Sequence, residues 1–234
     1  MTRRYYAPEL SPAGGLIQLS DEEAGHAARV MRAQIGDSIQ LFDGCGNQAD
    51  ATVHSIDKRH CAVFASPPQA IDREPACRSH FGIAFPKPER AKEMIERLTE
   101  LGVHRITPIT CDRTQRPPTD ALLTKMRRIV IESCKQCERN HLMAIDRPVN
   151  FDEFVCRPLE GARWIAHPDG QLLDSVTANR APDQQATVLI GPEGGFTDDE
   201  VNLAKDMGFA PVGLGKRIYR IETAACAIAA FLSE

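Results

Sequence analysis

The sequence of 234 residues lacks a long hydrophobic run and a large excess of either charge. Its longest apolar runs are roughly ten residues, about half of what a helix needs to span a bilayer, so no membrane segment is expected. No apolar segment follows the basic start, so we expect no signal peptide. Eight cysteines without a secretory signal indicate reduced thiols in a cytoplasmic protein.

The charges are unevenly distributed. The formal net charge of −4 argues weakly against a nucleic-acid partner, yet residues 87–147 carry 13 basic and 9 acidic side chains. A local basic face is what phosphate binding requires, although a solvated helix surface explains the same pattern equally well. A hydrophobic content of 42% is enough for a core and excludes disordered and fibrous classes.

Prolines divide the chain into two parts. The pair Pro67-Pro68 lies in the stretch 66–75, and adjacent prolines stop both strands and helices, so this stretch is the expected linker. Before it, the pattern predicts a capped helix and short strands, over residues 20–32, 39–42, 49–56 and 61–65.

After the linker, strands and helices alternate. Strands are predicted at 80–85, 105–109, 163–166 and 187–190, and helices at 89–101 and 119–139. This alternation is typical of a mostly parallel sheet covered by helices.

The densest chemical signal is the segment Val188–Glu200, in which a buried strand runs into a glycine-rich loop. Gly191, Gly194 and Gly195 allow positive φ and close approach of the backbone to a ligand. Ligands of α/β sheets bind at the carboxyl ends of strands, where this loop is expected. Its glycine order matches neither the dinucleotide fingerprint nor the P-loop, and a purely structural turn remains an alternative.

A second loop, Leu214–Ala224, follows another short strand and precedes an apolar terminal helix. Two glycine-bearing loops at strand ends, without a P-loop lysine, suit a compact neutral or cationic cofactor. Together with Thr99–Val103, these loops resemble the SPOUT methyltransferase superfamily, and within it the bacterial 16S ribosomal RNA uracil-N3 methyltransferase family (RsmE type). The resemblance covers nearly the whole chain, through the segments Arg4–Tyr6, His26–Arg32, Leu41–Gly44, Glu100–Val103, Gln136–Arg139, Ile190–Phe196 and Arg217–Ala224.

The resemblance implies an α/β fold in which a trefoil-knotted SPOUT-type methyltransferase domain, over residues 76–234, follows a smaller β-rich PUA-like RNA-binding domain, over residues 1–70. It implies an enzyme that uses S-adenosylmethionine to methylate N3 of a uridine, acts on 16S ribosomal RNA or the small ribosomal subunit, and works as a homodimer. The alternative is a non-catalytic RNA-binding ribosome-assembly factor that retains the fold.

The resemblance also implies site residues. The cofactor would be held by Ile190, Gly191, Pro192, Glu193, Gly194, Gly195, Leu214, Gly215, Ile218, Tyr219, Thr223 and Ala224. Arg220 is the candidate for orienting the uracil or stabilising its anion. Glu193 and Glu222 are candidates for hydrogen bonding and proton transfer, while a helix-capping role for Glu222 is equally open.

RNA contacts are expected from arginines in both parts of the chain, namely Arg3, Arg4, Arg29, Arg32, Arg97, Arg113, Arg116, Arg128 and Arg139.

The sequence departs from the family pattern at four positions. Arg97 replaces a usual lysine and Glu138 a glycine, while Tyr219 and Ile221 replace a leucine and a threonine.

A metal site is the alternative for Cys134-x-x-Cys137-x-x-x-His141. A structural zinc site usually has four ligands, commonly from two separated pairs, and no second pair is present. Core packing is therefore favoured, and no metal is expected. His26 and His167 are read as hydrogen-bonded structural residues or, less often, direct participants.

Overall fold

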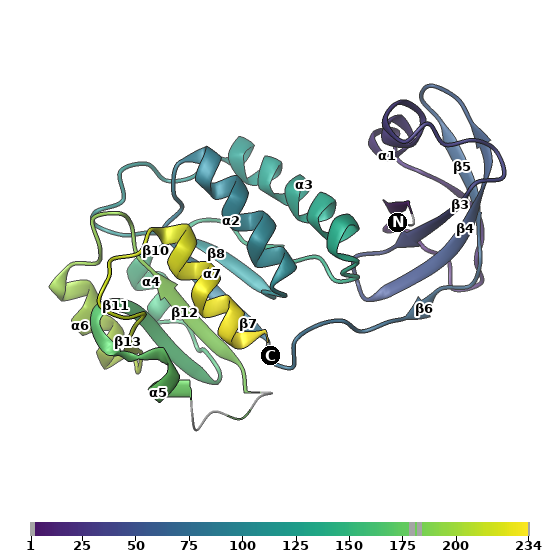
Figure 1. The fold of residues 1–234 in the computed structure, drawn as a ribbon. Coiled ribbons are helices and arrows are strands. Elements are labelled where there is room, and N and C mark those ends of the chain that lie inside the picture. Colours follow the sequence, from purple (N-terminus) through teal and green to yellow (C-terminus); the bar gives the residue numbers. More distant parts are fainter. Residues whose placement is uncertain (1–2, 178–180, 182–183, 234) are drawn as a thin grey trace. The chain divides into compact units, whose positions relative to one another are not determined.

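The computed structural model describes residues 3–177, 181 and 184–233, so the first two residues and the last residue of the expected domains lie outside the described part. The chain divides into two compact units (Figure 1). One comprises the chain up to Glu74 together with Ile131–Leu142, and the other comprises Pro75–Val130 and the chain from Met143 onward. The expected domain boundaries did not assign residues 131–142 to the first unit. The reason is that the helix α3 (Asp120–Cys137) continues without a break from the second unit into this segment, so no local signal marks the boundary.

The first unit is built on a six-stranded sheet in the order β1-β3-β4-β5-β2, with β6 beside β4. Only β1 and β3 pair in parallel; the other pairs are antiparallel. Alternate residues such as Leu41, Val53 and Val63 form its core. Its strands are β1 (Arg4–Tyr6), β2 (Gly15–Gln18), β3 (Ser38–Phe42), β4 (Asn47–Ile56), β5 (Cys61–Ala65) and β6 (Gln69–Ala70).

The predicted N-terminal helix is shorter than expected. It consists of α1 (Asp21–Gly25) followed by a π-helical turn, η1 (His26–Val30). Ser20 caps α1 by accepting a hydrogen bond from the amide of Glu23 (3.3 Å). The carboxylate of Glu23 does not close the capping box; it forms a buried ion pair with Lys135 of α3. The capping-box pattern in the sequence therefore predicted the start of the helix correctly. It did not predict that the carboxylate of Glu23 pairs with Lys135.

The cysteines of the C-x-x-C pattern pack in this unit. Cys134 is fully buried, its thiol lies 3.5 Å from the main-chain oxygen of His141, and burial raises its pKa to about 12. Within the described residues, no group of three or more His, Cys, Asp or Glu side chains is placed to hold a metal ion. This geometry supports the packing interpretation of Cys134.

Glu138 follows the last residue of α3 and has a φ of +61°. This left-handed conformation at a helix C-terminus favours glycine, because a Cβ costs about 1–2 kcal/mol there. The side chain is half exposed and only 3.8 Å from Arg73, an ion pair of small value. The glycine that the resemblance implies at this position would adopt this conformation freely, whereas Glu138 holds a strained backbone.

We predict that Glu138→Gly raises the free energy of unfolding by about 0.5–1 kcal/mol, because relief of strain exceeds the added entropy of the unfolded chain. Glu138→Ala is the matched control: it removes the same ion pair but keeps the Cβ. Urea unfolding monitored by circular dichroism should rank the glycine variant above the alanine variant. If the two variants were equally stable, the strain argument would be wrong.

The second unit contains a sheet of seven strands, and all their pairings are parallel. The order is β10-β8-β7-β12-β11-β13, with β9 beside β8. Its strands are β7 (Ser79–Ile83), β8 (Arg105–Thr110), β9 (Ala144–Ile145), β10 (Val149–Asn150), β11 (Ala162–Leu172), β12 (Ala186–Ile190) and β13 (Ala210–Gly213). The parallel sheet predicted from the alternating pattern is confirmed.

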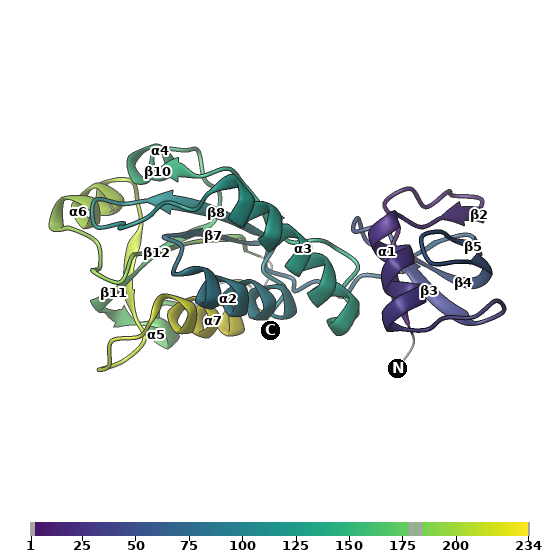
Figure 2. The ribbon, with the colours of Figure 1, turned by 90° about the horizontal axis from the view of Figure 1, so that it is seen from above.

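Helices cover both faces of this sheet (Figure 2). On one face α2 (Pro88–Glu100) packs against α7 (Ile221–Leu232), and on the other α4 (Phe151–Val155) packs against α6 (Asp198–Asp206). The short α5 (Leu173–Thr177) follows β11 and contacts it and β13. None of the described helices is long and apolar enough to cross a membrane.

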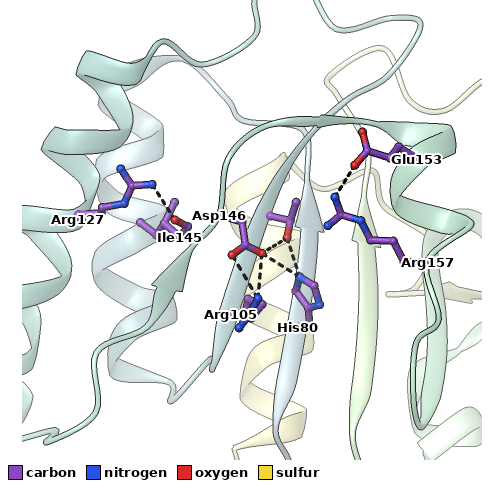
Figure 3. A network of polar contacts seen from close by, with 8 residues as sticks. His80, Arg105, Arg127, Ile145, Asp146, Glu153 and Arg157 are labelled. Carbon is purple, nitrogen blue, oxygen red and sulfur yellow. Dashed lines mark hydrogen bonds and ion pairs between the residues drawn. The ribbon is translucent and has the colours of Figure 1, made fainter. Parts of the chain in front are cut away.

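A polar network lies at the amino-terminal part of β7 and β8 (Figure 3). The Thr107 hydroxyl donates to the carboxylate of Asp146 (2.6 Å), so it accepts from Nε2 of His80 (2.8 Å). Arg105 also contacts Asp146 (3.3 Å). Beside this network, Arg127 of α3 donates to the main-chain oxygen of Ile145 (2.9 Å), which joins the helix to β9.

Burial lowers the pKa of His80 to about 4, and this effect outweighs the opposing attraction of Asp146. Three cationic or titratable neighbours, Arg105, Arg157 and His104, lower the pKa further. The imidazole is therefore neutral in the folded protein at neutral pH.

We predict that His80 makes the protein sensitive to acid. Its pKa in the folded protein lies below the ordinary value of 6.5, so stability is complete above pH 6.5 and is lost as the pH falls toward 4. The full loss is on the order of 3 kcal/mol. His80→Gln keeps an N–H donor for Thr107 and should flatten this part of the pH–stability curve, whereas the exposed His54→Gln should not. An unchanged slope in His80→Gln would exclude this assignment.

Candidate active site

The carboxyl ends of the parallel strands lie at one edge of the second sheet, and both glycine-bearing loops begin there. Ile83 at the end of β7 is the register partner of Ile190 at the end of β12, and the amide of Ala84 donates to the oxygen of Ile190 (2.9 Å). The loop 191–197 therefore starts beside the β7–α2 connection. The loop 214–220 starts two strands away, after β13.

Between them, β11 carries an irregular segment. Its pairing with β13 shifts register between Ala166 and Gln171, which leaves His167-Pro-Asp-Gly170 as a bulge. A Cβ on Gly170 would lie 2.5 Å from the backbone of Val212, and one on Gly213 would lie 2.7 Å from the oxygen of Gly170. Both glycines are thus required for this close approach. Of this segment only His167 is a candidate from the sequence, although a Pro-Asp-Gly run inside a strand is itself a signal for a bulge.

In the first loop, only one of the three candidate glycines has positive φ: Gly195, at +72°. This corrects the expectation for Gly191 and Gly194. A Cβ on Gly191 would meet the ring of Phe196 at 3.0 Å, so that glycine is needed for close packing, whereas Gly194 has ordinary contact distances. The predicted capping box at the start of α6 is confirmed, with Thr197 and Glu200 bonding each other's amides.

Two candidate carboxylates lie near one arginine that is not among the residues expected from the sequence. Arg90, in the first turn of α2, lies 3.9 Å from Glu193 and 3.9 Å from Glu222. The Glu222 residue is only 6% exposed, and its Oε2 atom has no hydrogen-bond partner among the described residues. The signal that could have found Arg90 is its position shortly after β7, the strand next to β12.

Glu222 does not cap α7. The cap position belongs to Arg220, whose side chain makes no capping hydrogen bond. Arg220 is exposed, and its guanidinium forms no ion pair or hydrogen bond within the described part of the chain. An Arg220–Glu222 pair, the structural alternative for this arginine, is therefore absent from the described residues.

The second loop is open. Gly215 has a φ of +106° and no atom within 4 Å of the position that a Cβ would occupy, and Ile218 is 89% exposed. Arg217 donates to the Tyr219 hydroxyl (3.3 Å) and lies over its ring. Of the other expected cofactor residues, Thr223 is exposed and Ala224 is buried on α7.

These residues fit S-adenosylmethionine. Gly195 and Gly215 leave open space where a side chain would stand, so the backbone of both loops can approach a ligand. The buried Glu222 oxygen without a partner among the described residues suits the positively charged part of the cofactor. Backbone amides and carbonyls of both loops would hold the neutral part.

The structure separates the nine RNA-contact candidates. Arg4 and Arg139 are buried: Arg4 donates to Asn140 and to the oxygen of Cys134 (3.0 Å), and Arg139 forms a bidentate pair with Glu74. Because these guanidiniums satisfy internal acceptors, both residues are removed from the RNA-binding set. Exposed on the two units are Arg29, Arg32, Arg97, Arg113, Arg116 and Arg128, while Arg3 is half-buried beside Asp37.

Of the two candidate histidines, only His167 has its expected hydrogen bond; the buried Nδ1 of His26 has no partner among the described residues. His167 Nδ1 accepts from the amide of Asp169 (3.3 Å) within the β11 bulge. His26 packs edge-on against Tyr5, with ring centres 6.2 Å apart.

Comparisons with known proteins agree with this arrangement. Residues 73–233 match the family model described as an RNA methyltransferase domain, and residues 19–64 match an RNA methyltransferase PUA domain. A Ribosomal RNA small subunit methyltransferase E of Synechocystis is 32% identical, over 89% of this chain and 69% of the relative. One from Bacillus subtilis is 26% identical, over 89% and 86%. The structure of one from Neisseria gonorrhoeae, bound to S-adenosylmethionine, superposes with a TM-score of 0.91 at 27% identity, covering 99% and 97% of the chains.

The fold and the two strand-end loops define a SPOUT-type methyltransferase with a PUA-like domain, which confirms the fold class expected from the resemblance. The protein is an S-adenosylmethionine-dependent enzyme that methylates ribosomal RNA. The chain belongs to the RNA methyltransferase family represented by these small-subunit enzymes.

We predict that Gly195→Ala lowers S-adenosylmethionine affinity by about tenfold or more, because a Cβ strains the loop by about 1–2 kcal/mol and enters the open space. Gly208→Ala is the matched control. Gly208 also has positive φ, at +85°, but it precedes β13 at the opposite edge of the sheet. Calorimetric titration should show a loss for Gly195→Ala only. Equal affinity losses would mean that general destabilisation, not the loop, is responsible.

Proposed function

We propose that this enzyme transfers the methyl group of S-adenosylmethionine to N3 of a uridine in 16S ribosomal RNA, either free or within the small ribosomal subunit. The single observation that carries the proposal is Arg220. It is an exposed guanidinium without a partner among the described residues, and it stands where the cofactor loop enters α7. The small-subunit specificity named for the relatives supports the same substrate.

The chemistry requires a donor, a nucleophile and a place for the proton. The bound cofactor supplies an electrophilic methyl group on a positively charged sulfur. Uracil N3 becomes nucleophilic when its proton leaves, and negative charge then develops on the two ring oxygens. Arg220 donates hydrogen bonds to this developing charge, which stabilises the transition state more than the ground state.

We assign different roles to the carboxylates of Glu193 and Glu222, because they differ in burial. The Glu193 side chain is 46% exposed, so a base inserted from RNA can reach it, and we assign it the N3 proton. The Glu222 side chain is 8% exposed, and we assign it to the positively charged part of the cofactor. Arg90 lies near both carboxylates, and its positive charge favours the ionised form of each.

RNA would be held by exposed arginines on each unit. Arg29, Arg32 and the half-buried Arg3 serve the PUA-like unit, and Arg97, Arg113, Arg116 and Arg128 serve the methyltransferase unit. We place the enzyme in the cytoplasm, where ribosomal subunits are found; its eight cysteines are all free thiols.

We also propose a homodimer in which the partner chain completes the cofactor pocket. Phe231 on α7 is 45% exposed, and Ile218 on the cofactor loop is 89% exposed. Between Thr223 and Phe231 the outward side of α7 carries small, partly exposed residues that permit close helix packing. A partner covering α7 would bury both large apolar side chains.

We predict that Arg220→Ala lowers the single-turnover rate of methyl transfer by about a hundredfold or more, with little change in cofactor affinity. The measurement uses saturating S-adenosylmethionine and small subunits from a strain lacking the enzyme. Lys216→Ala, an exposed cation on the same loop, is the control and should retain the rate. Loss of RNA affinity alone, with an unchanged rate at saturation, would make Arg220 a phosphate anchor.

We predict that the protein sediments as a dimer at micromolar concentration and that Phe231→Glu shifts it toward monomer with loss of activity, because a carboxylate would be buried at the interface. Phe64→Glu changes another exposed aromatic, on the first unit, and should leave the dimer intact. A fully active monomer would remove the homodimer proposal.

A further inference from the structure

Arg113 holds the cofactor loop on both sides of its left-handed residue. It lies in the loop after β8, at the same sheet edge as the loop after β12. Its Nη1 donates to the main-chain oxygens of Gly194 (2.8 Å) and Phe196 (3.2 Å), which flank Gly195. The side chain thereby fixes the one segment of the loop whose backbone conformation is unusual.

A second side chain also links the loop after β8 to the segment after β12, and this one comes from the β12 side. The buried carboxylate of Glu200 accepts from the amide of Asp112 through Oε1 (2.9 Å) and from the amide of Thr197 through Oε2 (2.8 Å). The β8 loop is itself closed by a turn in which Thr114 and Cys111 bond each other (2.8 and 2.9 Å). The backbone on both sides of Arg113 is thus held by hydrogen bonds.

The guanidinium is only partly used. Arg113 is exposed, and within the described part of the chain its Nε and Nη2 atoms have no hydrogen-bond partner. A guanidinium offers five N–H donors in a planar fork, so one side can bind a phosphate while the other remains on the loop. The same loop carries Arg116 and the carboxylate of Asp112, which leaves it with net positive charge.

We propose that Arg113 couples RNA binding to cofactor binding. A backbone phosphate of the RNA would take Nε and Nη2, while Nη1 keeps Gly194 and Phe196 in the conformation that receives the cofactor. Each ligand then favours the same orientation of one side chain. Linkage requires that the cofactor raises RNA affinity by the factor by which RNA raises cofactor affinity. This inference rests on the proposed function and assigns Arg113 as a positioning residue.

The test measures that coupling factor. S-adenosylhomocysteine serves as a cofactor probe that cannot react, and small ribosomal subunits from a strain lacking the enzyme serve as the RNA. The affinity for the probe is measured with and without subunits, and the affinity for subunits with and without the probe. For the unaltered protein we expect a coupling of roughly tenfold in both directions.

Two variants separate coupling from charge. Arg113→Lys keeps the positive charge but cannot bridge the loop and a phosphate, so coupling should fall toward one while subunit binding largely survives. Arg116→Ala should weaken subunit binding and leave the coupling factor unchanged. Melting temperatures confirm that both variants are folded.

The outcomes are distinct. No coupling in the unaltered protein, or unchanged coupling in Arg113→Lys, overturns this inference while the proposed function stands. Failure of the unaltered protein to bind the probe or the subunits would overturn the proposed function, and this inference with it. Equal loss of coupling in both arginine variants would show that general positive charge, and not the bridge, is responsible.

Discussion

The insertion of β12 between β7 and β11 is the constraint on which the active site depends. The pairing of β12 with β7 joins residues about one hundred positions apart, and both pairings are parallel. Parallel pairing places every strand's carboxyl end at one edge, so the connection leading to Arg90, the loop 191–197 and the loop 214–220 converge there. Had β12 paired in the opposite direction, Glu193 would lie at the far end of the sheet from Arg90.

The regular elements of the methyltransferase unit were predictable from the sequence because they carry strong local signals. The α2 helix has a wide apolar face, and α6 begins with a complete capping box at Thr197. The shortest strands were not found, because two residues such as those of β9 and β10 bear no period and exist only through tertiary pairing. Likewise, the boundary between the two units after Val130 is invisible in sequence, since the helix α3 continues across it.

The candidate site was predictable where backbone conformation decides it and unpredictable where long-range partners do. Glycine spacing located both loops, but only the structure distinguishes Gly195, which needs positive φ, from Gly191, which needs close packing. For charged residues the sequence shows a type and not a partner. Arg4 reads as exposed at the start of the chain, yet it is buried against Asn140, 136 positions away.

The departures from the family pattern follow the same division. Tyr219 and Ile221 are both accommodated by the structure: the Tyr219 hydroxyl accepts a hydrogen bond from Arg217, and Ile221 is buried at the start of α7. Glu138 is different, because its left-handed backbone conformation is one that favours glycine, the residue that the resemblance implies there. A glycine chosen for its φ is therefore costly to replace, whereas a side chain beside a backbone-built pocket is not, and this difference explains which departures the fold absorbs without strain.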